Sequence, residues 1–235
     1  MIDYIILLIE NKKYLMTIQE INPFCIDKYR IPIEREYENW IVSSMDIFFK
    51  SQNIPFESIA PSPLKEKQIP ADQIIVIDNS IVLGIQFKSP QLSNNKKEIE
   101  DQIHWLLNKP EQYNKIASSN SLNESMCNID IWYCLPYFLN RKCRFFGLNY
   151  CLFFKPGTRI MINDTAKIND NFFFTREKPN TAWLKNIMPK NQLSNIDVKS
   201  WSWNDFYTKI INHEVGSYHD SYEEVCSYIS QGMNS

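Results

Sequence analysis

The stretch of residues 69–90, IPADQIIVIDNSIVLGIQFKSP, contains two short apolar runs that predict a β-hairpin. Residues 74–77 and 81–87 are rich in Ile and Val and have the length of buried strands. The sequence Asp78-Asn79-Ser80 between them is typical of a turn. We therefore expect the fold to be built around this hairpin, with the other segments packed against it.

Three polar side chains of the hairpin are expected to meet at one spot. Side chains alternate between the faces of a strand, so Gln86 and Lys88 are predicted to share one face of the second strand. Asp72 precedes the first strand, and an antiparallel return brings it beside that face. A carboxylate with further oxygens holds Mg²⁺, and a neighbouring lysine orients an attacking water or neutralises charge on a phosphate.

The order Asp72, thirteen intervening residues and then Gln86-x-Lys88 resembles the PD-(D/E)xK nuclease superfamily, in particular its Mrr-like branch with a Q-x-K variant. Pro70-Ala71-Asp72 stands where that pattern has Pro-Asp. The resemblance covers about residues 30–140 and implies an α/β (α+β) fold: a restriction-endonuclease-like core with a central mixed β-sheet flanked by helices. It also implies Mg²⁺ or Mn²⁺ as the cofactor.

The same family carries a glutamate on the helix before the hairpin, and residues 33–49 are expected to form that helix. Its apolar positions recur at three- and four-residue steps, namely Ile33, Tyr37, Trp40, Ile41, Met45 and Phe48. Tyr37-Glu38 resembles the opening of the Mrr-type helix, so Glu38 is the candidate catalytic residue and metal ligand, and Glu34 is the reserve. Acids near a helix N-terminus are also favoured by the helix dipole, which is the alternative explanation.

The chain is expected to have three parts. Residues 1–30 are predicted to form a β-hairpin cover, residues 31–140 the nuclease-like core, and residues 141–235 a C-terminal extension packed on the core. Within the core, residues 128–138 read as a buried strand, and a capped helix is expected from Asn95, with Ile99, Ile103, Leu106 and Leu107 facing inward. Gln102 on that helix either turns toward the site or lies at the boundary of the apolar stripe. In the extension, helices are expected near residues 205–211 and 221–230.

A basic, aromatic-rich segment follows the core. Residues 131–163 contain no acid and five basic residues: Arg141, Lys142, Arg144, Lys155 and Arg159. Basic side chains beside aromatic rings hold phosphates and stack unpaired bases, so these five are the candidate nucleic-acid-binding residues. The alternative is a hairpin with its aromatics in the core and its charges solvated.

The composition excludes several other classes. The net charge of −2 gives no overall attraction to nucleic acid, so any such surface is local. No glycine-rich phosphate loop occurs, and the six cysteines form no CxxC pair, which argues against nucleotide-dependent enzymes and zinc sites. The apolar N-terminal run is too short to span a membrane, and reduced thiols in the cytoplasm are the default expectation.

These observations predict a magnesium-dependent endonuclease, a hydrolase of phosphodiester bonds with DNA as the expected substrate. The resemblance also implies that the protein belongs to a restriction, defence or mobile-element system. It would work with a protein partner that supplies target choice, or as a homodimer. Gln86 replaces the more usual acid, so an inactive nuclease-fold protein that binds nucleic acid or protein is the alternative. A purely structural α/β module whose aromatic surface recruits another chain is the third possibility. For the single residues, the alternative is that Asp72 is a turn residue and that Gln86 and Lys88 are an ordinary solvent-facing pair.

Overall fold

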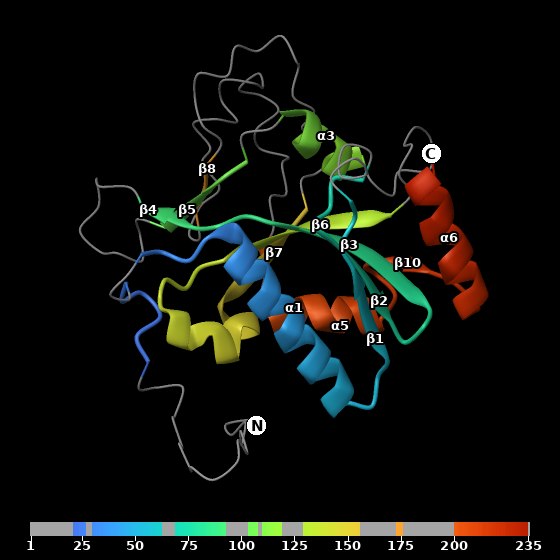
Figure 1. Ribbon diagram of the computed structural model, residues 1–235, viewed down its shortest axis with the longest axis horizontal. Coiled ribbons are helices and arrows are strands. Elements are labelled where there is room, and N and C mark those ends of the chain that lie inside the picture. The colour runs from blue at the N-terminus through green and yellow to red at the C-terminus, as the bar shows by residue number, and fades with distance from the viewer. Residues whose placement is uncertain are drawn as a thin grey trace.

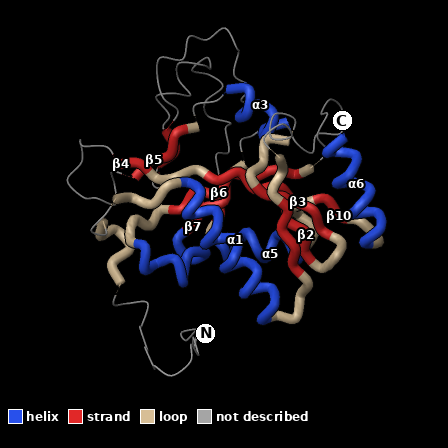
Figure 2. Tube along the Cα trace, viewed as in Figure 1, coloured by secondary structure: helices blue, strands red, loops and turns tan. Residues whose placement is uncertain are grey.

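The computed structural model describes residues 21–26, 30–62, 69–92, 103–107, 110–118, 129–155, 173–175 and 200–234. The expected N-terminal hairpin, Gln102 and Arg159 lie outside these ranges. The described part is a mixed α/β structure in which helices flank a central seven-stranded sheet (Figures 1 and 2). None of the helices within these ranges has the length and apolar character needed to cross a membrane.

The predicted hairpin forms the middle of the sheet. Strands β1 (Phe56–Ile59), β2 (Gln73–Ile77) and β3 (Ile81–Phe87) pair in antiparallel fashion, and every residue of β2 and β3 is buried. The backbone turns at Asp78 and Asn79, whose φ values of 53° and 54° lie in the left-handed region that these two residue types tolerate. Apolar runs buried on both faces explain why the strands lack strict alternation.

The other strands extend the sheet beyond β3. Strand β6 (Asp130–Pro136), which was predicted, lies parallel to β3, and β7 (Cys151–Phe154) and β9 (Ser200–Trp201) continue the sheet in antiparallel fashion. The short strand β10 (Ser217–Tyr218) also pairs with β3. Residues 141–235 therefore contribute strands to the central sheet itself.

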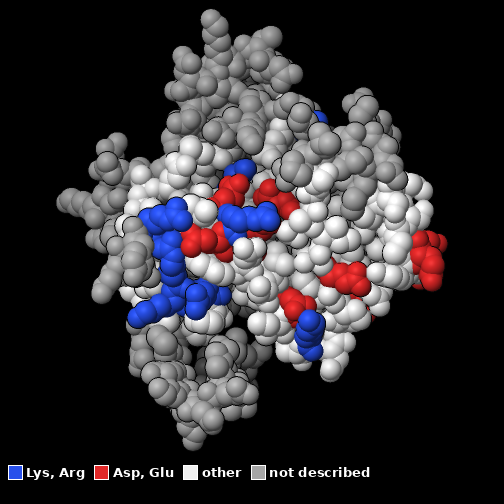
Figure 3. Space-filling model, in the orientation of Figure 1, with Lys and Arg blue, Asp and Glu red and all other residues white. Residues whose placement is uncertain are grey.

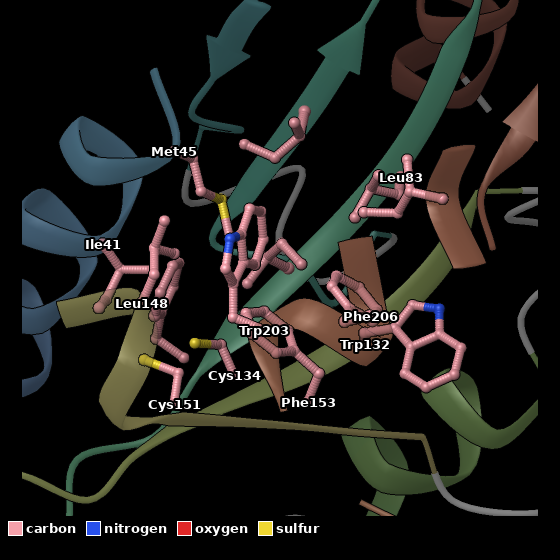
Figure 4. Close-up of a cluster of buried hydrophobic side chains, with 14 of the residues drawn as sticks. Ile41, Met45, Leu83, Trp132, Cys134, Leu148, Cys151, Phe153, Trp203 and Phe206 are labelled. Carbon is pink, nitrogen blue, oxygen red and sulfur yellow. The ribbon is translucent and has the colours of Figure 1, made fainter. Parts of the chain in front are cut away.

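Helices cover the two faces of the sheet. Helix α1 (Glu34–Ser51) and helix α5 (Trp203–Ile211) pack on one face, where Ile41 and Phe206 join a cluster that includes Leu83 of β3 (Figure 4). Helix α3 (Pro110–Ser118) and helix α6 (Tyr222–Asn234) contribute Ile116 and Val225 to a second cluster, which includes Val82 on the opposite face. The central strands are thus sandwiched between two apolar cores.

The structure corrects two local predictions. Residues Ile103–Leu106, expected in a helix, form strand β5 of a second sheet with β4 (Gln91–Leu92) and β8 (Phe173–Thr175). Pairing with β8 and burial of Trp105, whose Nε1 donates to the Pro136 carbonyl at 2.8 Å, favour the extended backbone over the helical spacing. Residues Arg141–Tyr150, which the alternative placed in a hairpin, form the 3₁₀ helix η2 between the antiparallel strands β6 and β7.

A buried ion pair ties the C-terminal region to the start of β6. Asp130 is 3% exposed and pairs with Lys155, which follows β7. Its Oδ2 also accepts hydrogen bonds from Trp132 Nε1 and from the Gly216 backbone N–H, both at 2.9 Å. Asp130 therefore joins β6, the end of β7 and the turn before β10.

We expect Asp130→Ala to lower the free energy of unfolding by about 3–5 kcal/mol, because removing one partner leaves a partly buried charge uncompensated. Urea denaturation measures this loss. The matched control is Asp46→Ala, which breaks the exposed Asp46–Lys50 pair at 2.8 Å and should cost less than about 1 kcal/mol. Equal effects of the two substitutions would contradict the prediction.

Candidate functional site

Asp72 and Gln86 lie opposite each other at the end of the β2–β3 hairpin that is farthest from its turn. The register pairs Gln73 with Ile85, and the Asp72 backbone N–H donates to the Ile85 carbonyl at 2.9 Å. Asp72 Oδ2 accepts hydrogen bonds from Gln86 Nε2 at 2.6 Å and from the Phe87 N–H at 2.7 Å. The structure thus brings together the acid and the amide that the sequence pattern singled out.

The electrostatics of Asp72 are unusual for a surface acid. Burial raises the pKa of Asp72 to about 6, although the hydrogen bond from the Phe87 N–H opposes this. The negative charge of Glu34 raises this pKa further, and the positive charge of Lys88 and the hydrogen bond from Gln86 lower it. A carboxylate whose pKa is raised in this way is stabilised in its charged form by a nearby cation.

Lys88 follows the last residue of β3 and is half-buried. Its backbone N–H donates to the Cys134 carbonyl of β6 at 3.1 Å, which fixes the end of the strand. The positive charge of Lys88 lowers the pKa of Asp72. The structure thus pairs the acid with the amide, and the meeting of the Lys88 ammonium with them stays a prediction.

The two glutamates of α1 have different positions. Glu34 Oε2 accepts a hydrogen bond from the Ser89 N–H at 3.3 Å, so its carboxylate reaches the end of β3 beside Lys88. Glu38 is buried and accepts hydrogen bonds from Gln73 Nε2 at 2.8 Å and from Arg35 at 3.2 Å. Gln73 and Asp72 are neighbours in the strand and face opposite sides of the sheet. The structure therefore places the Glu34 carboxylate at the end of β3 and holds the Glu38 carboxylate against Gln73 and Arg35.

Two residues that the sequence pattern did not single out, Gln112 and Tyr133, lie next to Gln86 of the Asp72–Gln86 pair. Gln112 of α3 donates from Nε2 to Gln86 Oε1 at 2.8 Å. Tyr133 of β6 pairs with Gln86 in the parallel register, and its burial raises its pKa, with the charges of Tyr113 and Asp72 adding to the effect. Pro110, a favoured first residue of a helix, was the signal that could have located α3 and hence Gln112.

The predicted basic residues are divided between structural and exposed roles. Arg141 holds η2 against α1 through contacts of 3.1–3.2 Å with Glu36, and Lys155 pairs with Asp130. Lys142 and Arg144 have exposed side chains on η2. Figure 3 shows basic side chains gathered beside acidic ones near the N-terminal end of α1.

No family model, curated protein or solved structure matches this chain. The interpretation of the site therefore rests on its geometry and chemistry.

The residues around Asp72 suit a hydrated divalent ion better than a metal held entirely by protein. Among the described ranges, no group of three or more His, Cys, Asp or Glu side chains is arranged to hold a metal. Mg²⁺ is commonly bound through one or two carboxylates together with waters and substrate phosphates, and Asp72 and Glu34 offer that number. The donor set therefore fits Mg²⁺ or Mn²⁺ with a bound phosphate.

Gln86 fits this role only after its amide reverses. Its Nε2 faces Asp72 and its Oε1 accepts from Gln112. Reversal of both amides would turn the Gln86 oxygen toward Asp72 while keeping a hydrogen bond between Gln86 and Gln112, because each amide has a donor end and an acceptor end of nearly equal size. Gln112 thus provides a partner for Gln86 in either orientation.

Proposed function

We propose that this chain is a divalent-metal-dependent nuclease that hydrolyses phosphodiester bonds of nucleic acid, with DNA as the expected substrate. The observation that carries the proposal is the hydrogen bond between the buried Asp72 carboxylate and Gln86, with Lys88 directly after β3 and the Glu34 carboxylate bonded to the Ser89 N–H at the same strand end. Hydrogen bonding and charge couple these groups at the end of one strand pair. A solvent-facing polar pair would not account for the burial and the raised pKa of Asp72.

The arrangement of elements supports a restriction-endonuclease-like core of the PD-(D/E)xK kind. Helix α1 is followed by the antiparallel strands β1, β2 and β3, and after β4 and β5 of the second sheet come α3 and the parallel strand β6. Without β4 and β5, this is the α-β-β-β-α-β order of the resembled family. The candidate residues lie at the end of β3, which side chains of α1 and α3 both reach.

Each residue has a distinct role in the proposed reaction. Asp72 and Glu34 would hold a divalent ion, which would supply Lewis-acid chemistry to the phosphate. The ammonium of Lys88 orients the attacking water and stabilises negative charge that builds on the phosphate oxygens. Gln112 and Tyr133 position Gln86, whose reversed amide adds an oxygen next to Asp72.

The proposal is tested by incubating the purified full-length chain with single-stranded and duplex DNA and RNA in Mg²⁺, in Mn²⁺ and in EDTA. Cleavage that requires a divalent ion and is lost in EDTA is the expected result. Absence of cleavage of every substrate in both metals would overturn the proposal. Preparations of the Asp72→Asn variant control for a contaminating nuclease.

An inactive nuclease-fold protein that binds nucleic acid or another protein is the second candidate. The neutral amide of Gln86 favours this second candidate, because Gln86 donates a hydrogen bond to the Asp72 carboxylate and so satisfies part of it without any metal. A protein of this kind would bind nucleic acid equally well in EDTA and in Mg²⁺, and its melting temperature would not respond to either metal.

The two glutamates of α1 provide a matched test of which acid serves the site. We expect Glu34→Gln to lower the cleavage rate about tenfold or more at limiting Mg²⁺, because the second carboxylate near the ion is lost. Glu38→Gln should lower it less than about twofold, because the carboxylate of Glu38 is held by Gln73 and Arg35 on the other face of the sheet. The readout is the initial rate as a function of metal concentration. The reverse ranking would show that Glu38 is the ligand.

A further inference from the structure

The surface formed by η2 and the first turns of α1 carries exposed cations next to an exposed aromatic ring. Phe145 is 44% exposed, and the Arg144 guanidinium lies over its ring at 4.7 Å from the centroid. Lys142 is exposed on the same helix, and the side chain of Arg35 is 69% exposed on α1. We call these four residues, Arg35, Lys142, Arg144 and Phe145, the η2 platform.

The η2 platform is attached firmly to α1 and so to the candidate site. Arg141 contacts Glu36 at the start of α1, and Ser44 Oγ contacts the Arg144 carbonyl at 3.4 Å farther along the same helix. Arg35 directly follows Glu34, whose carboxylate accepts a hydrogen bond from the Ser89 N–H just beyond the end of β3. The nine helical steps from Arg35 to Ser44 span ~14 Å, which is the rise of about four nucleotides in one stacked strand.

The chemistry of the platform differs from that of a surface for duplex DNA alone. Cations spaced along a helix neutralise backbone phosphates of any strand. An exposed ring with a guanidinium stacked on it offers a flat face for an unpaired base, which a base inside a duplex does not use. A buried ring would be explained by core packing, but almost half of the Phe145 surface remains open to solvent.

We propose that the η2 platform binds an unpaired nucleic-acid strand, with a base stacked on Phe145 and phosphates held by Lys142, Arg144 and Arg35. This inference rests on the proposed function in one respect: it makes the preferred substrate a nucleic acid with a single-stranded segment beside the scissile bond. The binding itself requires no divalent ion and no chemistry at Asp72.

The experiment measures binding of the full chain to fluorescent oligonucleotides of roughly 12 nucleotides, a length within known single-strand sites. Fluorescence anisotropy in EDTA compares single-stranded DNA, single-stranded RNA and the blunt duplex. We expect one or both single strands to bind at least about fivefold more tightly than the duplex, given the known range of base–aromatic stacking. Equal or tighter binding of the blunt duplex, or no binding of any oligonucleotide, would overturn the inference.

Variants separate stacking from charge. Phe145→Leu should remove most of the preference for the single strand and leave duplex binding unchanged. Lys142→Gln and Arg144→Gln should each weaken single-strand binding and reduce the slope of log affinity against log salt by about 0.7. Tyr218→Leu and Lys50→Gln are matched controls, because both residues are exposed and lie outside the platform. Melting temperatures equal to wild type confirm that the variants fold.

The outcomes distinguish this inference from the proposed function. A single-strand preference in EDTA that depends on Phe145, without cleavage in Mg²⁺ or Mn²⁺, would refute the nuclease and retain the platform. Metal-dependent cleavage with no effect of Phe145→Leu on strand preference would refute the platform and retain the nuclease.

Discussion

Replacing Asp72 with asparagine is expected to lower the rate of metal-dependent cleavage by a factor on the order of 10³. The substitution keeps the shape of the side chain and an oxygen that accepts from the Phe87 N–H, but it removes the charge that faces the ion. Initial rates at saturating Mg²⁺ measure the loss. Residual activity within tenfold of wild type would remove Asp72 from the site.

The same substitution should make the protein more stable at neutral and higher pH. The pKa of Asp72 is raised from 3.8 to about 6 in the fold, so between these values the native state holds a proton that the unfolded state has released. The unfolding free energy of the wild type therefore falls as pH rises through this window, by roughly 3 kcal/mol in total, and stays low above it. The asparagine of the variant does not titrate, so the unfolding free energy of the variant does not fall in this pH window.

Thermal melts from about pH 4 to pH 8 test this expectation. The melting temperature of Asp72→Asn should match that of the wild type at the acid end and exceed it near pH 8 by about 6–12 °C. Mg²⁺ should raise the melting temperature of the wild type by mass action and have little effect on the variant. A variant that is less stable than wild type at pH 8 would contradict the argument.

Replacing Lys88 with alanine is expected to lower the cleavage rate by about 10²–10³ while leaving metal binding intact. The ammonium group is assigned to the water and the phosphate, and its positive charge opposes the approach of a cation to Asp72. The Mg²⁺-induced rise in melting temperature should therefore persist or increase in this variant. Loss of both activity and metal response would instead indicate a structural role.

The charge of Lys88 also predicts a change in the pH dependence. Its charge lowers the pKa of Asp72, so Lys88→Ala should move the acid limb of the residual rate profile to higher pH. Lys50→Ala is the matched control, since Lys50 is an exposed lysine at the far end of α1. An unchanged acid limb would show that Lys88 does not act on Asp72.

The sequence was most informative where the decisive contacts are local. Asp72 and Gln86 are joined by one hairpin, and its apolar runs and turn residues were enough to predict their pairing. The helix of residues 33–49 was predicted from its periodicity and corresponds to α1. The apolar run at residues 128–138 likewise predicted β6.

The residues that were missed depend on long-range placement. Glu34, the reserve, and Glu38, the first choice, lie one helical turn apart, and only the position of α1 against the sheet decides which of them lies at the end of β3. Gln112 enters from α3, after a segment in which residues Ile103–Leu106 were read as helix and in fact pair with β8. Helical spacing over four residues also suits a buried strand, so local periodicity could not decide between them.

The way the C-terminal region joins the central sheet limits how far this chain can be shortened. A fragment ending near residue 140 would keep Asp72, Gln86 and Lys88 but lose β7, which covers the outer hydrogen-bonding edge of β6. An uncovered apolar edge strand readily pairs with another copy and promotes aggregation. Such a shortened chain should precipitate on expression, so removing the C-terminal region is a poor way to obtain a smaller version of this fold.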